Sequence, residues 1–150
     1  MKRNRPFSLA FVLILLSLVV SACAGSGQAG GNGGHVKMAP LDDMPAEVRA
    51  APIPVREAYQ FAVANPEITS SIPCYCGCGA MGHTSNYACY VAGQDPQGRI
   101  AYDNHALGCS ICVDITQDAM RLAGEGKSAE AIFGYIDATY ARYGPSNMQQ

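Results

Sequence analysis

Three cysteines stand at alternate positions in the run Cys74-Tyr75-Cys76-Gly77-Cys78. Side chains two residues apart point to the same side of an extended segment, so this spacing predicts that the three thiols lie in one row. Neighbours this close do not easily bridge each other at the separation and torsion of a disulfide. Thiolates are ligands that Cu(I) and Zn(II) prefer, and glycine lets the backbone curl until the sulfurs converge. The run therefore indicates a site for a soft metal ion.

A histidine and two further cysteines follow with helical spacing. His105, Cys109 and Cys112 are separated by four and then three residues, which places them on one face if the segment is a helix. An imidazole and two thiolates supply three of the four ligands of a tetrahedral site. Cys89 stands between the two groups, and His83 is a further candidate in the loop before it. The candidate metal ligands are Cys74, Cys76, Cys78, Cys89, His105, Cys109 and Cys112, with His83 as an additional one.

The pair Cys109 and Cys112 also permits redox chemistry. A C-x-x-C pair at a helix start can have a lowered thiol pKa and exchange disulfides, with Cys109 as the nucleophile. Val113 follows the pair, so the C-x-x-C-H pattern of covalent haem attachment is absent. Nothing in the sequence resembles a hydrolase triad, and we do not expect an enzyme unless this pair is redox-active.

Helices on both sides must position these ligands. Residues 54–64 combine a proline suited to a first turn with an apolar stripe, and Asn65-Pro66 ends that pattern. Residues 44–50 predict a shorter helix before it. The stretch 89–102 holds two apolar runs around a polar, glycine-containing turn, and this arrangement predicts a short β-hairpin.

A helical hairpin is expected near the C-terminus. The helical pattern over 104–123 stops at Gly124, Ser128 can cap a last helix, and Gly144-Pro145 ends it. The fold class is therefore mainly α. We expect a small cysteine-rich helical domain with an irregular cysteine-bearing loop and a C-terminal helical hairpin. A core this small gains from a metal or a disulfide staple.

The N-terminus has the composition of a secretory signal. Three basic residues precede an apolar run over 7–20, which is shorter than the ~18–20 residues of a membrane-spanning helix. The sequence VSAC that ends at Cys23 resembles the bacterial lipobox, whose cysteine is diacylated and becomes the first mature residue. Two acyl chains suffice for stable attachment. We expect residues 1–22 to be a lipoprotein signal peptide and Cys23 to hold the protein at the extracytoplasmic face of the bacterial cell membrane.

The remainder divides into a tether and one domain. Residues 23–40 comprise the lipidated cysteine and a glycine-rich flexible arm, and residues 41–150 form the cysteine-rich domain. Without the signal, seven basic residues remain against twelve acidic ones, a balance that argues against nucleic-acid binding. Lipidation of Cys23 leaves six cysteines. In an oxidising compartment these could instead form a purely structural framework of disulfides, with fifteen pairings available.

A series of short motifs covers the middle of the chain: PCYCGC at 73–78, GHTS at 82–85, Cys89, DNH at 103–105, and the pair Cys109 and Cys112. Together with the lipobox, this series resembles the PCYCGC-motif lipoproteins, over about residues 54–144. That family is named for its motif and not for an activity. The resemblance therefore implies the class of protein and leaves its function to be argued from the residues.

The C-terminal third has a second, looser likeness. CSIC followed by GEGKSAEAIFGYIDATYARYG is similar to the helical hairpin of the CcmH-type thiol oxidoreductases of cytochrome c maturation. In those proteins a C-x-x-C pair precedes a GxS-x2-EI turn and an RYG end. Here the turn is one residue off and Arg142-Tyr143-Gly144 matches. The likeness implies a thiol–disulfide role for Cys109 and Cys112.

The cysteine clusters favour a membrane-anchored lipoprotein that binds a soft metal ion for capture, storage or transfer. Copper(I) is the first expectation and zinc(II) the second. A membrane metal transporter or a thiol-redox protein is the expected partner. A thiol–disulfide oxidoreductase and a disulfide-stapled structural lipoprotein are the alternatives.

Overall fold

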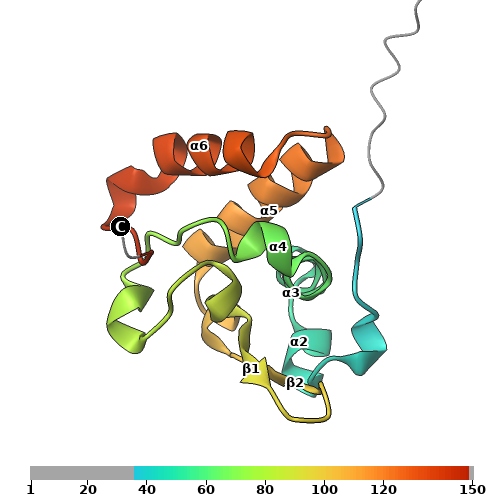
Figure 1. Ribbon diagram of the computed structural model, residues 1–150. Coiled ribbons are helices and arrows are strands. Elements are labelled where there is room, and N and C mark those ends of the chain that lie inside the picture. The colour runs from blue at the N-terminus through green and yellow to red at the C-terminus, as the bar shows by residue number, and fades with distance from the viewer. Residues whose placement is uncertain (1–35, 149–150) are drawn as a thin grey trace, which may run out of the picture. The chain divides into compact units, whose positions relative to one another are not determined.

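The computed structural model describes residues 36–148. The expected signal peptide, Cys23 and most of the expected tether lie outside these residues. The described part is mainly helical, which confirms the predicted fold class. Its helices and strands are α2 (Ala46–Ala50), α3 (Ile53–Ala64), α4 (Pro66–Thr69), β1 (Val91–Gln94), β2 (Ile100–Tyr102), α5 (Ser110–Gly124) and α6 (Ala129–Tyr140) (Figure 1). Short 3-10 turns at Leu41–Asp43, Cys78–Met81, Tyr87–Cys89, His105–Leu107 and Ala141–Tyr143 connect them. Within residues 36–148, no helix has the length and apolar character needed to cross a membrane.

Helix α3 forms where the sequence predicts a helix. Pro54 lies in its first turn, where the missing N–H removes no helical hydrogen bond. Tyr59 and Phe61 are fully buried on its inner face. At its end, the side-chain amide of Asn65 donates to the carbonyls of Phe61 and Lys37, each at 2.8 Å. This residue therefore closes the helix and holds the incoming chain against it.

Helix α5 is the centre of the domain. It packs against α3 on one side and against α6 on the other (Figure 1). Its buried residues recur every three or four positions and include Cys112, Ile115, Thr116 and Ala119. The side chain of Ser128 caps α6 by accepting the backbone N–H of Ala131 at 3.3 Å. The predicted C-terminal helical hairpin is thus confirmed as α5 and α6.

The predicted continuous helix over 104–123 is wrong at its start. His105–Leu107 is a separate 3-10 turn, and α5 begins only at Ser110. The break lies at Cys109, whose backbone is extended with φ −121° and ψ 99°. Because the chain changes direction there, His105, Cys109 and Cys112 do not share one helical face.

The predicted hairpin is confirmed as the antiparallel pair β1 and β2, in which Val91 stands opposite Tyr102. Asp95 closes its turn by accepting the backbone N–H groups of Gln97 and Arg99 at 2.9 and 2.8 Å. The base of the hairpin is joined by a hydrogen bond from the N–H of Asp103 to the carbonyl of Tyr90, at 2.9 Å. The hairpin therefore brings the chain segments around Cys89 and His105 side by side.

The burial of α5 predicts a large cost for truncating its core face. Ile115→Ala removes a side chain with 0% exposure and should lower the free energy of unfolding by about 2–5 kcal/mol. Ile53→Ala makes the same chemical change at a side chain that is 59% exposed, and should cost well under half as much. Urea unfolding measures both. Equal losses in the two variants would contradict the packing of α5.

Candidate metal centre

The cysteine-rich loop turns inward at Gly77. This glycine has φ +84°, a left-handed conformation that favours glycine over other residues, and it leads directly into the turn Cys78–Met81. Cys74 and Cys78 are buried, and Cys76 is half-buried. The backbone thus curls at this glycine, and the sulfurs of Cys74, Cys76 and Cys78 converge near that of Cys112.

Five sulfur atoms form one connected network of contacts. The Sγ of Cys112 lies 3.0 Å from that of Cys74, 3.5 Å from Cys76 and 3.4 Å from Cys89. The pairs Cys74–Cys76 and Cys78–Cys89 are 3.4 and 3.7 Å apart. A disulfide bond is ~2.05 Å long, and the six cysteines of the described part are all free. Sulfurs bound at ~2.3 Å to one tetrahedral ion are ~3.8 Å apart, so the cluster has the dimensions of a metal–thiolate site.

Two histidines adjoin the sulfurs. The Nε2 of His105 lies 3.4 Å from the Sγ of Cys76. The rings of His83 and His105 meet edge to face with their centroids 5.1 Å apart. His83 is only 8% exposed, and its Nδ1 is buried without a hydrogen-bond partner among the described residues. A buried polar atom left unpaired costs about 1–3 kcal/mol, and a metal ion is one partner that would remove this cost.

Asp103 holds both histidines. Its Oδ2 lies 3.4 Å from the Nε2 of His83, and its Oδ1 accepts the backbone N–H of His105 at 2.7 Å. A carboxylate on one imidazole nitrogen fixes the tautomer and leaves the other nitrogen free for a metal. This role was not among the sequence predictions. The signal was available, because Asp103 immediately precedes the Asn104-His105 pair in one of the family motifs.

The donor atoms form three overlapping groups of four: Cys74, Cys78, Cys89 and Cys112; Cys76, Cys78, His105 and Cys112; and Cys78, His83, Cys89 and His105. Within each group all four donor atoms lie within 4.8 Å of one another. Cys78 belongs to every group. Seven of the eight candidate ligands are therefore brought together, and these groups could hold a metal ion.

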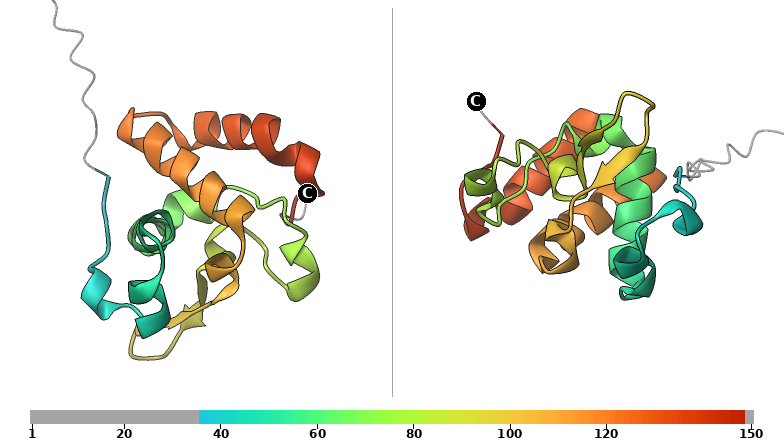
Figure 2. Two further views of the ribbon diagram at one scale, coloured as in Figure 1. Left: turned by 180° about the vertical axis from the view of Figure 1, so that it is seen from behind. Right: turned by 90° about the horizontal axis from the view of Figure 1, so that it is seen from below.

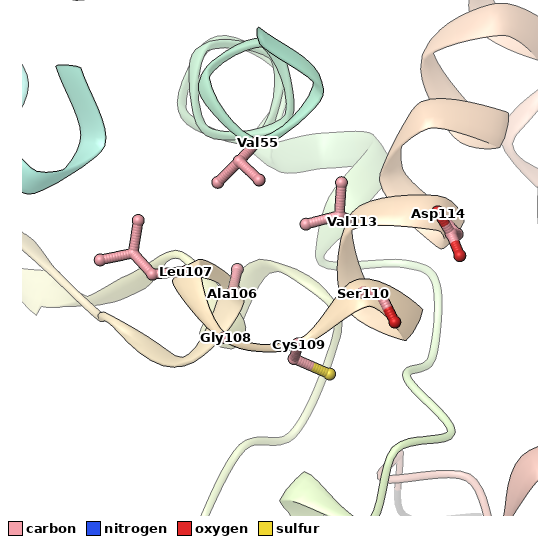
Figure 3. A pocket seen from close by; sticks show the side chains of 8 residues that line it. All are labelled: Val55, Ala106, Leu107, Gly108, Cys109, Ser110, Val113 and Asp114. Carbon is pink, nitrogen blue, oxygen red and sulfur yellow. The ribbon is translucent and has the colours of Figure 1, made fainter. Parts of the chain in front are cut away.

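Cys109 is the candidate that the structure does not bring into these groups. It is half-buried at the N-cap of α5 and lines a pocket of about 290 Å³ together with Val55, Leu107 and Asp114. Figure 3 shows Val55 and Cys109 at opposite sides of this pocket. Cys112, by contrast, is fully buried among the other sulfurs. The two thiols of the C-x-x-C pair therefore have different surroundings.

A family model described as "Protein of unknown function with PCYCGC motif" matches residues 12–147. The chain belongs to this family. The match confirms the resemblance that the motifs indicate. No curated protein and no solved structure matches the chain, and nothing in these comparisons supports the likeness to the CcmH-type hairpin. The family description gives no activity, so the function has to be argued from the geometry.

The crowding of the PCYCGC thiols determines how they ionise. Hydrogen bonds from Cys112 and Cys89 lower the pKa of Cys74. Burial, together with the negative charge of the Cys74 thiolate, raises the pKa of Cys76 and of Cys78. The group thus favours one thiolate that its neighbours share. A bound cation would offset the repulsion among further thiolates.

A buried polar network fixes the first turn of α5 beneath the sulfurs. The carbonyl of Cys112 accepts hydrogen bonds from the Tyr90 hydroxyl at 2.9 Å and from the Asn86 amide at 3.3 Å. The hydroxyl of Thr116 lies 2.6 Å from that of Tyr90 and 2.8 Å from the Oδ1 of Asn86. Each buried polar group has a partner, so the network positions Cys112 without an unpaired donor.

The C-terminal segment forms hydrogen bonds with the PCYCGC motif through Asn147. Asn147 accepts the N–H of Cys74 through its Oδ1 at 2.7 Å, and its own N–H donates to the Cys74 carbonyl at 3.1 Å. Its Nδ2 lies 3.5 Å from the Sγ of Cys78. Both views in Figure 2 show the red C-terminal segment beside the light-green stretch of the motif. No sequence pattern pointed to Asn147, because it stands alone after the last helix.

The close approach of this segment predicts the effect of a single methyl group. In Gly144→Ala, the new Cβ would lie 2.8 Å from the carbonyl oxygen of Tyr75, so the backbone must shift at a cost of about 1–3 kcal/mol. Gly134→Ala is the control, because nothing lies within 4 Å of its Cβ in α6. That change should stabilise the helix by about 0.5–1 kcal/mol. Urea unfolding measures both variants, and a neutral Gly144→Ala would contradict this contact.

Proposed function

We propose that this PCYCGC-family protein is a lipid-anchored extracytoplasmic protein that binds a soft metal ion, Cu(I) or Zn(II), for capture, storage or transfer. The observation that carries the proposal is the convergence of five thiols and two imidazoles on one largely buried cluster. They come from the PCYCGC motif, from the loop after it that holds His83, from the two ends of the hairpin and from α5. Sulfur and imidazole nitrogen are the ligands that both ions prefer.

A metal accounts for features that a disulfide framework does not. Five sulfurs in one contact network cannot all be paired two by two, so one thiol would remain. Disulfides also leave no role for the two histidines beside the sulfurs, or for the buried Nδ1 of His83. A metal ion uses an odd number of thiols as readily as an even one and binds imidazole directly.

The half-buried thiol of Cys76 supports exchange with a partner. It contacts Cys74 and Cys112 on the inner side and His105 on the other, while the remaining four sulfurs of the cluster are buried. An ion could pass to a membrane transporter through this thiol without unfolding of the loop. A lipid anchor and a short flexible arm would keep the domain near such a partner.

Metal uptake is the first test. The full chain, purified and reduced under anaerobic conditions, should bind Cu(I) or Zn(II) in a fixed ratio, measured by elemental analysis. Replacing Cys74, Cys76 and Cys78 together by serine should abolish uptake. Two of the four-donor groups each lose two cysteines, and the third loses Cys78, which all three groups share. Cys109→Ser is the control and should bind as the original protein does. Undiminished metal binding by the triple variant would contradict the proposal.

Membrane attachment is tested through Cys23. In a bacterial host, the original protein should incorporate labelled palmitate and sediment with the membranes. Cys23→Ser removes the acylated sulfur, so the label should be lost and the protein should leave the membrane fraction. Cys109→Ser should keep both properties. An original protein that takes up no label would contradict the lipid anchor, whatever its distribution.

A further inference from the structure

Two of the four-donor groups have two donor residues in common. The four-cysteine group and the mixed group of two cysteines and two histidines have Cys78 and Cys89 in common, and these sulfurs are 3.7 Å apart. We propose that the centre binds two divalent thiophilic ions of the zinc class, bridged by the thiolates of Cys78 and Cys89. This inference rests on the proposed metal-binding function and specifies its stoichiometry.

The distance between the two shared sulfurs fits two ligands of one tetrahedral ion. Two sulfurs on one tetrahedral ion at ~2.3 Å are ~3.8 Å apart, close to the observed Cys78–Cys89 separation of 3.7 Å. Two tetrahedra that share these two sulfurs need six donors in all. Cys74 and Cys112 complete the first, with their sulfurs in contact, and His83 and His105 complete the second. Cys76 remains at the rim of the first ion.

His83 provides an independent reason for a second ion. A single ion in the four-cysteine group would leave both imidazoles without a metal. The Nδ1 of His83 would then stay buried and unpaired among the described residues, while its Nε2 faces Asp103 at 3.4 Å. An ion on the histidine side gives this nitrogen a partner. The carboxylate then has the place of the outer-shell group that orients a metal-bound imidazole.

Charge balance decides which ions fit. The four thiolates of the two groups carry four negative charges, and neutral imidazoles add none. Two divalent ions neutralise them, whereas one divalent ion or two Cu(I) ions would leave two negative charges. The four cysteines are at most 1% exposed, so a net charge there would be costly. Asp103 lies outside this balance, because its side chain is 25% exposed to water.

The test counts zinc ions. Reduced full-length protein is loaded with Zn(II) under anaerobic conditions, freed of excess metal and examined by native mass spectrometry. We expect two ions per chain in the original protein and in Cys109→Ser. The double variant His83→Ala and His105→Ala should retain one, because the four-cysteine group is intact. One ion in the original protein, or two in the double histidine variant, would overturn this inference alone. No ion in the original protein would overturn the proposed function as well.

A second measurement does not depend on any variant. In the original protein loaded with ¹¹³Cd, NMR should show two cadmium resonances, one from an all-sulfur site and one from a mixed sulfur–nitrogen site. Because the two nuclei share thiolates, each signal should be split by coupling to the other. Two unsplit resonances, or a single one, would contradict the bridge.

Discussion

The domain depends on the packing of five thiols around the first turn of α5. Five sulfurs meet there from three parts of the chain, and Cys112 contacts Cys74, Cys76 and Cys89. Burial and neighbouring charge both oppose a second thiolate in such a group. A small domain has little apolar core with which to offset that cost. A cation bound at this centre would offset that cost.

The surrounding structure serves to hold these ligands in position. The hydrogen-bond network of Asn86, Tyr90 and Thr116 fixes the backbone carbonyl of Cys112. Asp103 contacts the ring of His83 and the backbone N–H of His105, and Asn147 forms hydrogen bonds with the cysteine-rich loop. Except for the contact between Asp103 and His105, these polar contacts join residues at least 20 positions apart. Directed contacts of this kind place donor atoms more accurately than apolar packing alone, and accurate placement is what a coordination site requires.

The sequence predicts the regular elements well and the centre in part. Apolar periodicity identified the helix at α3 and the C-terminal hairpin, and thiol spacing identified the cysteines of the centre. Cys109 was included because the spacing argument assumed an unbroken helix. The chain is instead extended at Cys109, so α5 begins only at Ser110 and His105 lies in a separate turn. Tertiary contacts such as those of Asn147 with Cys74 leave no periodic signal, so the role of Asn147 could not be predicted. The role of Asp103 was missed although its position beside Asn104 and His105 gave a signal.

X-ray absorption at the metal K-edge of the loaded full-length protein tests the central claim most directly. If the buried cluster is a metal centre, the first coordination shell should be mainly sulfur at ~2.3 Å, with a smaller contribution from imidazole nitrogen at ~2.0 Å. A shell of oxygen and nitrogen without sulfur would place the metal elsewhere on the protein and would contradict the account.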